Sequence, residues 1–208
     1  MFALVDDQLT WHVARASGLV AWVIATASIV WGLTLSTRLI RRRGIAPWLL
    51  DLHRYLGTVT VVFVVIHMIA LGIDKYVNFG LKELFVPMGT TWRPGAVAWG
   101  IVAFYLLVAI QISSRYMRKL PRRLWHTIHL TSFVMFVTGT VHGFQAGADA
   151  DNVLVQWTCL AGCTLVAFLA LFRVLVPRRD QRAAAAVARQ SRVVATQPTE
   201  EEMYVNAR

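Results

Sequence analysis

Long apolar runs alternate with short polar links along most of the chain, and each run holds about 18 or more residues with few or no charges. In an α-helix, about 20 residues at a rise of about 1.5 Å each cover the roughly 30 Å hydrocarbon layer of a bilayer. The pattern predicts five transmembrane helices, over residues 16–37, 50–73, 95–114, 124–146 and 152–172. Because the links are short, we expect consecutive helices to be antiparallel neighbours in one bundle.

The composition indicates an all-α integral membrane protein. Of the residues, 57% are hydrophobic and only 15% are charged, which is too apolar for an ordinary soluble domain. A formal net charge of +10 would suit a nucleic-acid partner only if the basic residues covered one face of a soluble fold. They lie in short clusters between the apolar runs, so we expect the lipid bilayer, and no nucleic acid, as a partner. Cys159 and Cys163, four residues apart in one run, fit helix packing and no disulfide framework.

The basic clusters predict the orientation, because lysine and arginine stay on the cytoplasmic side of a membrane. Three clusters must share that side, and they follow the first, third and fifth spans at residues 38–43, 115–123 and 173–182. We therefore expect a protein of the cytoplasmic membrane with its N-terminus outside and its C-terminus inside. Its parts would be an extracytoplasmic segment (1–15), a transmembrane helical domain (16–176) and a flexible cytoplasmic tail (177–208). The N-terminus has no basic region or small-residue cleavage site, so the first span is expected to serve as the insertion signal.

Histidine is the residue type that points to chemistry. The chain has six histidines: His12, His53, His67, His126, His129 and His142. Ionisable groups within spans are costly and are functional by default. Fourteen residues separate His53 from His67 in the second span, and thirteen separate His129 from His142 in the fourth. At about 1.5 Å per residue both intervals are near 20 Å. Both spans run in the same direction, so His53 and His129 share an inner level, and His67 and His142 share an outer level.

Two imidazoles that face each other from two helices provide the two axial ligands of a b-type haem. The two levels therefore predict two haems b, one held by His53 and His129 and the other by His67 and His142. A metal-transport site would instead gather carboxylates, thiolates or histidines around one point, and the spans hold almost no carboxylate. The simpler alternative is four buried polar residues satisfied by backbone carbonyls. Arg54, directly after His53, can pair with a haem propionate or reach lipid phosphate.

The angular positions fit the second span better than the fourth. At about 100° per residue, 14 residues return to within about 40° of the starting face, whereas 13 residues miss it by about 140°. We expect a change of winding or a bend at Thr138–Thr140 to re-aim His142, unless the two haems approach this span from different sides. His126 gives no better spacing to His142, and we expect it to be solvated or near a propionate rather than an iron ligand.

The segments WLLDLHRYLGTVTVVFVVIHMIALGI and LWHTIHLTSFVMFVTGTVHGF resemble the two haem-bearing helices of the ferric reductase-like transmembrane domain. NADPH oxidases, eukaryotic ferric reductases and the bacterial haem subunit of periplasmic methionine sulfoxide reductase share this domain. The resemblance covers roughly residues 16–176 and places the family's ligands on His53, His67, His129 and His142. Its basic residue after the first histidine falls on Arg54. Many members have an extra N-terminal span, and the oxidases carry a C-terminal FAD and NADPH domain that this sequence lacks.

These observations predict transmembrane electron transfer, from a cytoplasmic flavoprotein or quinol to an extracytoplasmic redox protein, ferric chelate or oxygen. The sequence holds no nucleotide-binding fingerprint such as a glycine-rich turn after a strand, so a redox partner in trans would supply the flavin or quinone. The basic cluster of residues 115–123 either docks an acidic partner or only fixes the topology. The alternative functions are a haem or metal transporter or chaperone, and a structural membrane anchor without a cofactor.

Overall fold

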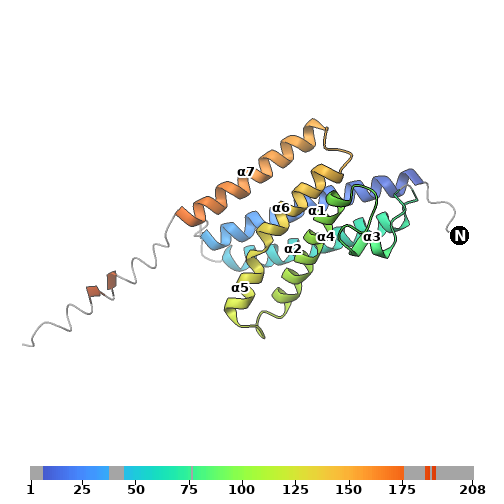
Figure 1. Cartoon of the computed structure of the whole chain (residues 1–208). Coiled ribbons are helices and arrows are strands. Elements are labelled where there is room, and N and C mark those ends of the chain that lie inside the picture. The colour runs from blue at the N-terminus through green and yellow to red at the C-terminus, as the bar shows by residue number, and fades with distance from the viewer. Residues whose placement is uncertain (1–6, 38–44, 76, 176–185, 188, 191–208) are drawn as a thin grey trace, which may run out of the picture. The chain divides into compact units, whose positions relative to one another are not determined.

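The computed structural model describes residues 7–37, 45–75, 77–175, 186–187 and 189–190, and it is entirely helical in its regular structure over these residues (Figure 1). Its helices are α1 (Asp7–Thr37), α2 (Ile45–Ile73), α3 (Leu81–Phe85), α4 (Pro94–Arg115), α5 (Arg122–Leu130), α6 (Ser132–Ala146) and α7 (Val153–Leu175). The chain divides into two units, residues 1–170 and residues 171–208. Apart from the last five residues of α7, everything described below concerns the first unit. The expected flexible tail and the basic clusters at 38–43 and 178–182 lie almost wholly outside the described residues.

Four of the described helices, α1, α2, α4 and α7, are long and apolar enough to cross a membrane. The all-α membrane class is therefore confirmed. Helix α1 begins at Asp7, earlier than the predicted start at residue 16. The fourth predicted span, 124–146, is two shorter helices, α5 and α6, which meet at Thr131.

The irregularity between α5 and α6 has a local cause. The Thr131 amide bonds to the carbonyl of Ile128, three residues back, at 3.1 Å. The Thr131 hydroxyl donates to the same carbonyl at 2.6 Å, and such side-chain bonds compete with the regular helix ladder. Our expectation of a change of winding at Thr138–Thr140 was wrong, because α6 runs without interruption through these residues. The change lies at Thr131, only two residues after His129.

The helices pack as two antiparallel pairs, α1 with α2 and α4 with α6, as the neighbouring ribbons in Figure 1 show. One core cluster joins α1, α6 and α7 through Ile29, Leu33, Phe136, Val166 and Leu169. Trp22 on α1 connects to α6, since its Nε1 donates to the Thr140 hydroxyl at 2.9 Å and its ring stacks on Phe136 with centroids 5.8 Å apart. The helix pairs are thus held together by packing and by a few polar links, as is usual for helices in lipid.

The link between α2 and α4 folds back over one end of these helices. Phe79 in the link packs with Val97 and Ile101 of α4. Asp74 is 2% exposed and accepts hydrogen bonds from the Thr10 hydroxyl at 3.5 Å and the Val77 amide at 3.3 Å. Arg93 donates to the Gln145 carbonyl at 2.7 Å. These contacts tie the link to α1, α4 and α6 at the same end of the unit.

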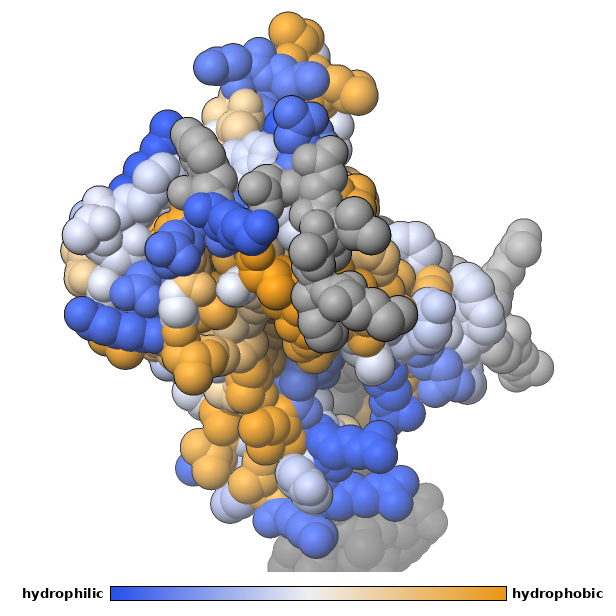
Figure 2. Space-filling view, turned by 90° about the vertical axis from the view of Figure 1, so that its right-hand side faces the viewer, coloured by the Kyte–Doolittle hydropathy of each residue, from blue (hydrophilic) through white to orange (hydrophobic). Residues whose placement is uncertain are grey.

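Many large apolar side chains are exposed on the outer faces of the helices. On α2 these include Val62, Val65 and Ile69, and on α7 Leu154 and Trp157. Figure 2 shows such side chains exposed between clusters of polar ones on the face that it views. Apolar exposure of this extent is costly in water and natural in lipid.

Candidate functional site: two histidine pairs

The structure brings the four predicted ligands together as two separate pairs. His53 of α2 lies beside His129 of α5, with ring centroids 5.9 Å apart and ring planes at 73°. His67 of α2 lies beside His142 of α6, with centroids 6.3 Å apart and planes at 82°. Each pair therefore joins α2 to one of the two helices that meet at Thr131.

Three of the four imidazoles are held by backbone carbonyls of a neighbouring helix. The Nδ1 atom of His67 lies 2.7 Å from the carbonyl oxygen of Ala14, and that of His142 lies 2.8 Å from the carbonyl of Ala96. The Nδ1 atom of His53 lies 2.9 Å from the carbonyl of Ser28. Because a carbonyl can only accept, Nδ1 must carry the proton in each ring. In the neutral imidazole Nε2 then keeps its lone pair, the form that binds a metal.

Two side chains contact His129. The ring of Trp125 stacks on it, with centroids 5.2 Å apart and planes at 25°. Its Nδ1 atom lies 3.5 Å from the hydroxyl oxygen of Ser114 on α4. The His53 ring also has a hydroxyl nearby, since the Ser28 Oγ lies 3.2 Å from its Nδ1.

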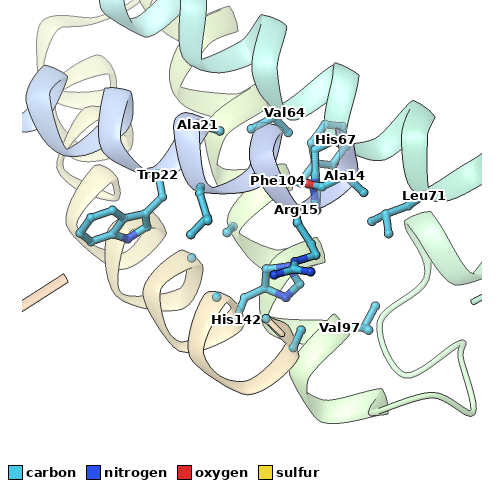
Figure 3. Close-up of a pocket in the computed structure, with 18 of the residues that line it drawn as sticks. Ala14, Arg15, Ala21, Trp22, Val64, His67, Leu71, Val97, Phe104 and His142 are labelled. Atoms are coloured by element: carbon cyan, nitrogen blue, oxygen red, sulfur yellow. The ribbon is translucent and has the colours of Figure 1, made fainter. Parts of the chain in front are cut away.

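A cavity of about 260 Å³ lies beside the His67–His142 pair, and most of its walls are apolar side chains of α1, α2, α4 and α6. Figure 3 shows Arg15 of α1 reaching into the same space as His67 and His142. Arg15 forms an ion pair with Asp149, which follows α6; its Nε donates to Asp149 Oδ2 at 2.9 Å and its second bond goes to Oδ1. Sequence reasoning missed this pair, because nothing in either residue's neighbourhood indicates a partner 134 positions away.

The other residues singled out from the sequence lie outside the pairs. Arg54 is exposed and pairs with Asp51, with 3.5 Å between Nη1 and Oδ1. His12 and His126 are both exposed. Within the described part of the chain, no group of three or more histidine, cysteine or acidic residues could hold a metal ion. The same part of the chain provides no hydrogen-bond partner for the buried indole nitrogens of Trp31 and Trp125.

These features define a class: a helical membrane protein that holds histidines in two pairs between its helices. The comparison with family models agrees with this class. The model described as ferric reductase like transmembrane component matches residues 17–140, which is more than half of the chain. The chain belongs to this family, and the predicted resemblance is confirmed. No curated protein and no solved structure matches the chain. The matched region runs from α1 into α6 and contains His53, His67 and His129, and the family points to transmembrane electron transfer.

Proposed function

We propose that the chain carries electrons across the membrane on two b-type haems, one held by His53 and His129 and the other by His67 and His142. The observation that carries this proposal is the spacing within each pair. Two metal–nitrogen bonds of about 2 Å and two imidazole radii of about 1.1 Å separate the ring centroids of a bis-histidine site by about 6.2 Å. The two pairs have centroid separations of 5.9 and 6.3 Å, so the residues present fit the group.

The surroundings of the rings support the same role. The carbonyls of Ala14, Ser28 and Ala96 fix the protonated nitrogen as Nδ1 and raise the basicity of the opposite one. The cavity beside the His67–His142 pair is lined mostly by apolar side chains, and such surroundings lower the local dielectric around a redox site. When bound, each haem would supply a one-electron redox centre held by the two histidines of its pair, and it would offer no open position to a substrate.

The orientation assigns a role to each pair. With the C-terminus in the cytoplasm, the His53–His129 pair lies on the cytoplasmic side and the His67–His142 pair on the extracytoplasmic side. Electrons would come from a cytoplasmic flavoprotein or quinol and leave to an extracytoplasmic redox protein, ferric chelate or oxygen. Five basic residues around the α4–α5 turn are exposed and could dock such a donor: Arg115, Arg118, Lys119, Arg122 and Arg123. Arg54, exposed one residue after His53, is the proposed partner of a propionate on that side. A reporter fused after Arg208 tests the orientation, which an extracytoplasmic signal would overturn.

Haem stoichiometry tests the proposal most directly. Protein purified from haem-replete cells should hold about two haems per chain and give a low-spin spectrum before and after dithionite reduction. His67→Ala should lose one haem and His53→Ala the other. His126→Ala, at an exposed ring, is the matched control and should keep both. Colourless wild-type protein, or unchanged haem content in His67→Ala, would refute the proposal. Substoichiometric and readily extracted haem would favour transport of haem as cargo.

A further inference from the structure

The helices that face the histidines carry a repeated arrangement of small residues. On α1, Ala14 and Ser28 supply the carbonyls that bind His67 and His53. A glycine follows each of them four residues later, at Gly18 and Gly32. Helix α4 repeats the arrangement for His142, with the carbonyl of Ala96 and the glycine at position 100.

Each of these glycines lies directly under an imidazole ring. A Cβ atom added to Gly18 would lie 3.0 Å from Nδ1 of His67, and one added to Gly32 would lie 3.2 Å from Cε1 of His53. At Gly100 a Cβ would lie 2.7 Å from both Nδ1 and Cε1 of His142. Carbon atoms in contact are normally about 3.5–4.0 Å apart. No side chain fits at these positions without moving the ring.

Helix geometry explains why the carbonyl and the glycine come together. In an α-helix the carbonyl of residue i accepts the amide of residue i+4, so the carbonyls of Ala14, Ser28 and Ala96 are those bonded to the three glycine amides. The imidazole must take the second lone pair of that oxygen. To reach this lone pair, the imidazole ring passes over the α-carbon of residue i+4, and a Cβ atom there would clash with the ring. Glycine is less favourable than alanine inside a helix, and the free approach of the ring offsets that disadvantage.

The spacing of the arrangement matches the spacing of the ligands. Gly18 and Gly32 are fourteen residues apart, as are His53 and His67. Helices α1 and α2 are antiparallel neighbours. Because the glycines of α1 and the histidines of α2 have the same spacing, each histidine of α2 lies against a glycine of α1 at its own depth. On α4, the position fourteen residues after Gly100 is Ser114, whose hydroxyl lies 3.5 Å from Nδ1 of His129. His129, the fourth histidine, thus meets a side-chain oxygen at the position where each of the other three histidines meets a glycine.

We infer that Gly18, Gly32 and Gly100 are positioning residues, which hold the planes of three axial imidazoles by leaving room for the Nδ1–carbonyl bond. This inference rests on the proposed haem ligation. The effect of adding a methyl group should be larger where the added Cβ lies closer to the imidazole ring. Gly100→Ala should therefore act most strongly, Gly18→Ala less and Gly32→Ala least. The His142 ring cannot simply retreat, since its bond to the Ala96 carbonyl is only 2.8 Å long.

The test compares these three alanine variants with Gly95→Ala, where an added Cβ meets nothing within 4 Å and the residue does not line the cavity beside His67 and His142. Alanine favours helix at all four positions, so a loss confined to the first three does not come from helix propensity. Three readouts apply to protein in detergent or nanodiscs: haem per chain, the midpoint potentials, and the EPR signal of the ferric haems. That signal depends on the angle between the two imidazole planes, which is 82° for the His67–His142 pair.

Gly100→Ala should lose about half of the bound haem, that of one bis-histidine site, or retain it with a shifted EPR signal and potential. The Gly95→Ala control should match the wild type in all three readouts. A folded Gly100→Ala protein with wild-type haem content, EPR signal and potentials would overturn the inference. If Gly100→Ala does not fold, the Gly18→Ala variant tests the inference instead. An unchanged EPR signal and unchanged potentials in Gly18→Ala would overturn the inference equally. A wild type without haem would instead refute the proposed function, so the two failures are distinct.

Discussion

The ion pair between Arg15 and Asp149 should stabilise the fold measurably, because it connects α1 to the turn that follows α6. The two side chains are 30% and 21% exposed. Arg15 binds the carboxylate through two nitrogens, with 2.9 Å between Nε and Oδ2. We propose to replace them with methionine and asparagine, singly and together, since these residues keep most of the volume and remove the charge.

The size of the effect follows from the exposure. Fully exposed ion pairs contribute about 0.2–1 kcal/mol, whereas removing one partner of a buried pair costs about 3–5 kcal/mol. Hydrogen bonds to charged groups contribute about 1.5–3 kcal/mol each in favourable cases. A two-bond pair that keeps a fifth to a third of its exposure lies between these limits. We expect a coupling free energy of about 1–2 kcal/mol between Arg15 and Asp149.

Unfolding by SDS, followed by circular dichroism, measures the four proteins of this double-mutant cycle. Arg15→Met and Asp149→Asn should each lower stability by about 1–2 kcal/mol, and the double variant should lose no more than the worse single one. Added salt should reduce the difference in stability between the wild type and the single variants, because the ion pair keeps some exposure to solvent. A coupling free energy below about 0.5 kcal/mol would refute the reasoning.

Three further substitutions have defined outcomes. Ser28→Ala removes the hydroxyl 3.2 Å from Nδ1 of His53 and leaves the backbone carbonyl at 2.9 Å. With the proposed haem ligation, the haem content of this variant should equal that of the wild type, and the midpoint potential should move by less than about 40 mV, equivalent to about 1 kcal/mol. Trp125→Phe keeps an aromatic ring on the stacked imidazole and removes a buried N–H that has no partner among the described residues. Stability to unfolding by SDS should be unchanged or higher by up to about 1 kcal/mol, and a clear loss of stability would contradict this. Gly162→Ala places a Cβ 2.8 Å from the ring of Trp22 and should cost about 1–3 kcal/mol in the same assay, whereas an unchanged midpoint would show that the ring gives way freely.

The levels of the histidines could be predicted from the sequence because depth along a helix depends only on its rise. Spacings of fourteen and thirteen residues differ by only about 1.5 Å in depth, and the structure places His53 beside His129 and His67 beside His142. Direction around the helix is more sensitive, since one residue changes it by about 100°. The break at Thr131 depends on local hydrogen bonds that a hydropathy pattern does not contain.

The contacts between helices were harder to predict. The Arg15–Asp149 pair depends on how the turn after α6 returns to α1, and hydropathy gives no information about that path. The glycines left a usable signal, because Gly18 and Gly32 repeat the fourteen-residue spacing of His53 and His67. A search of neighbouring spans for residues that repeat at the spacing of the histidines would have found these glycines. It would have missed Ser114, which stands fourteen residues after Gly100 and contacts His129 through its side-chain hydroxyl.

Helix α2 and the α5–α6 region present their histidines in different ways. On α2 the fourteen-residue interval lets one uninterrupted helix present His53 and His67 within about 40° of the same face. Between His129 and His142 an uninterrupted helix would leave the rings about 140° apart. The change at Thr131 falls within this interval and lets both rings meet α2. One side of each histidine pair is therefore set by regular helix geometry, and the other depends on a single local irregularity close to His129.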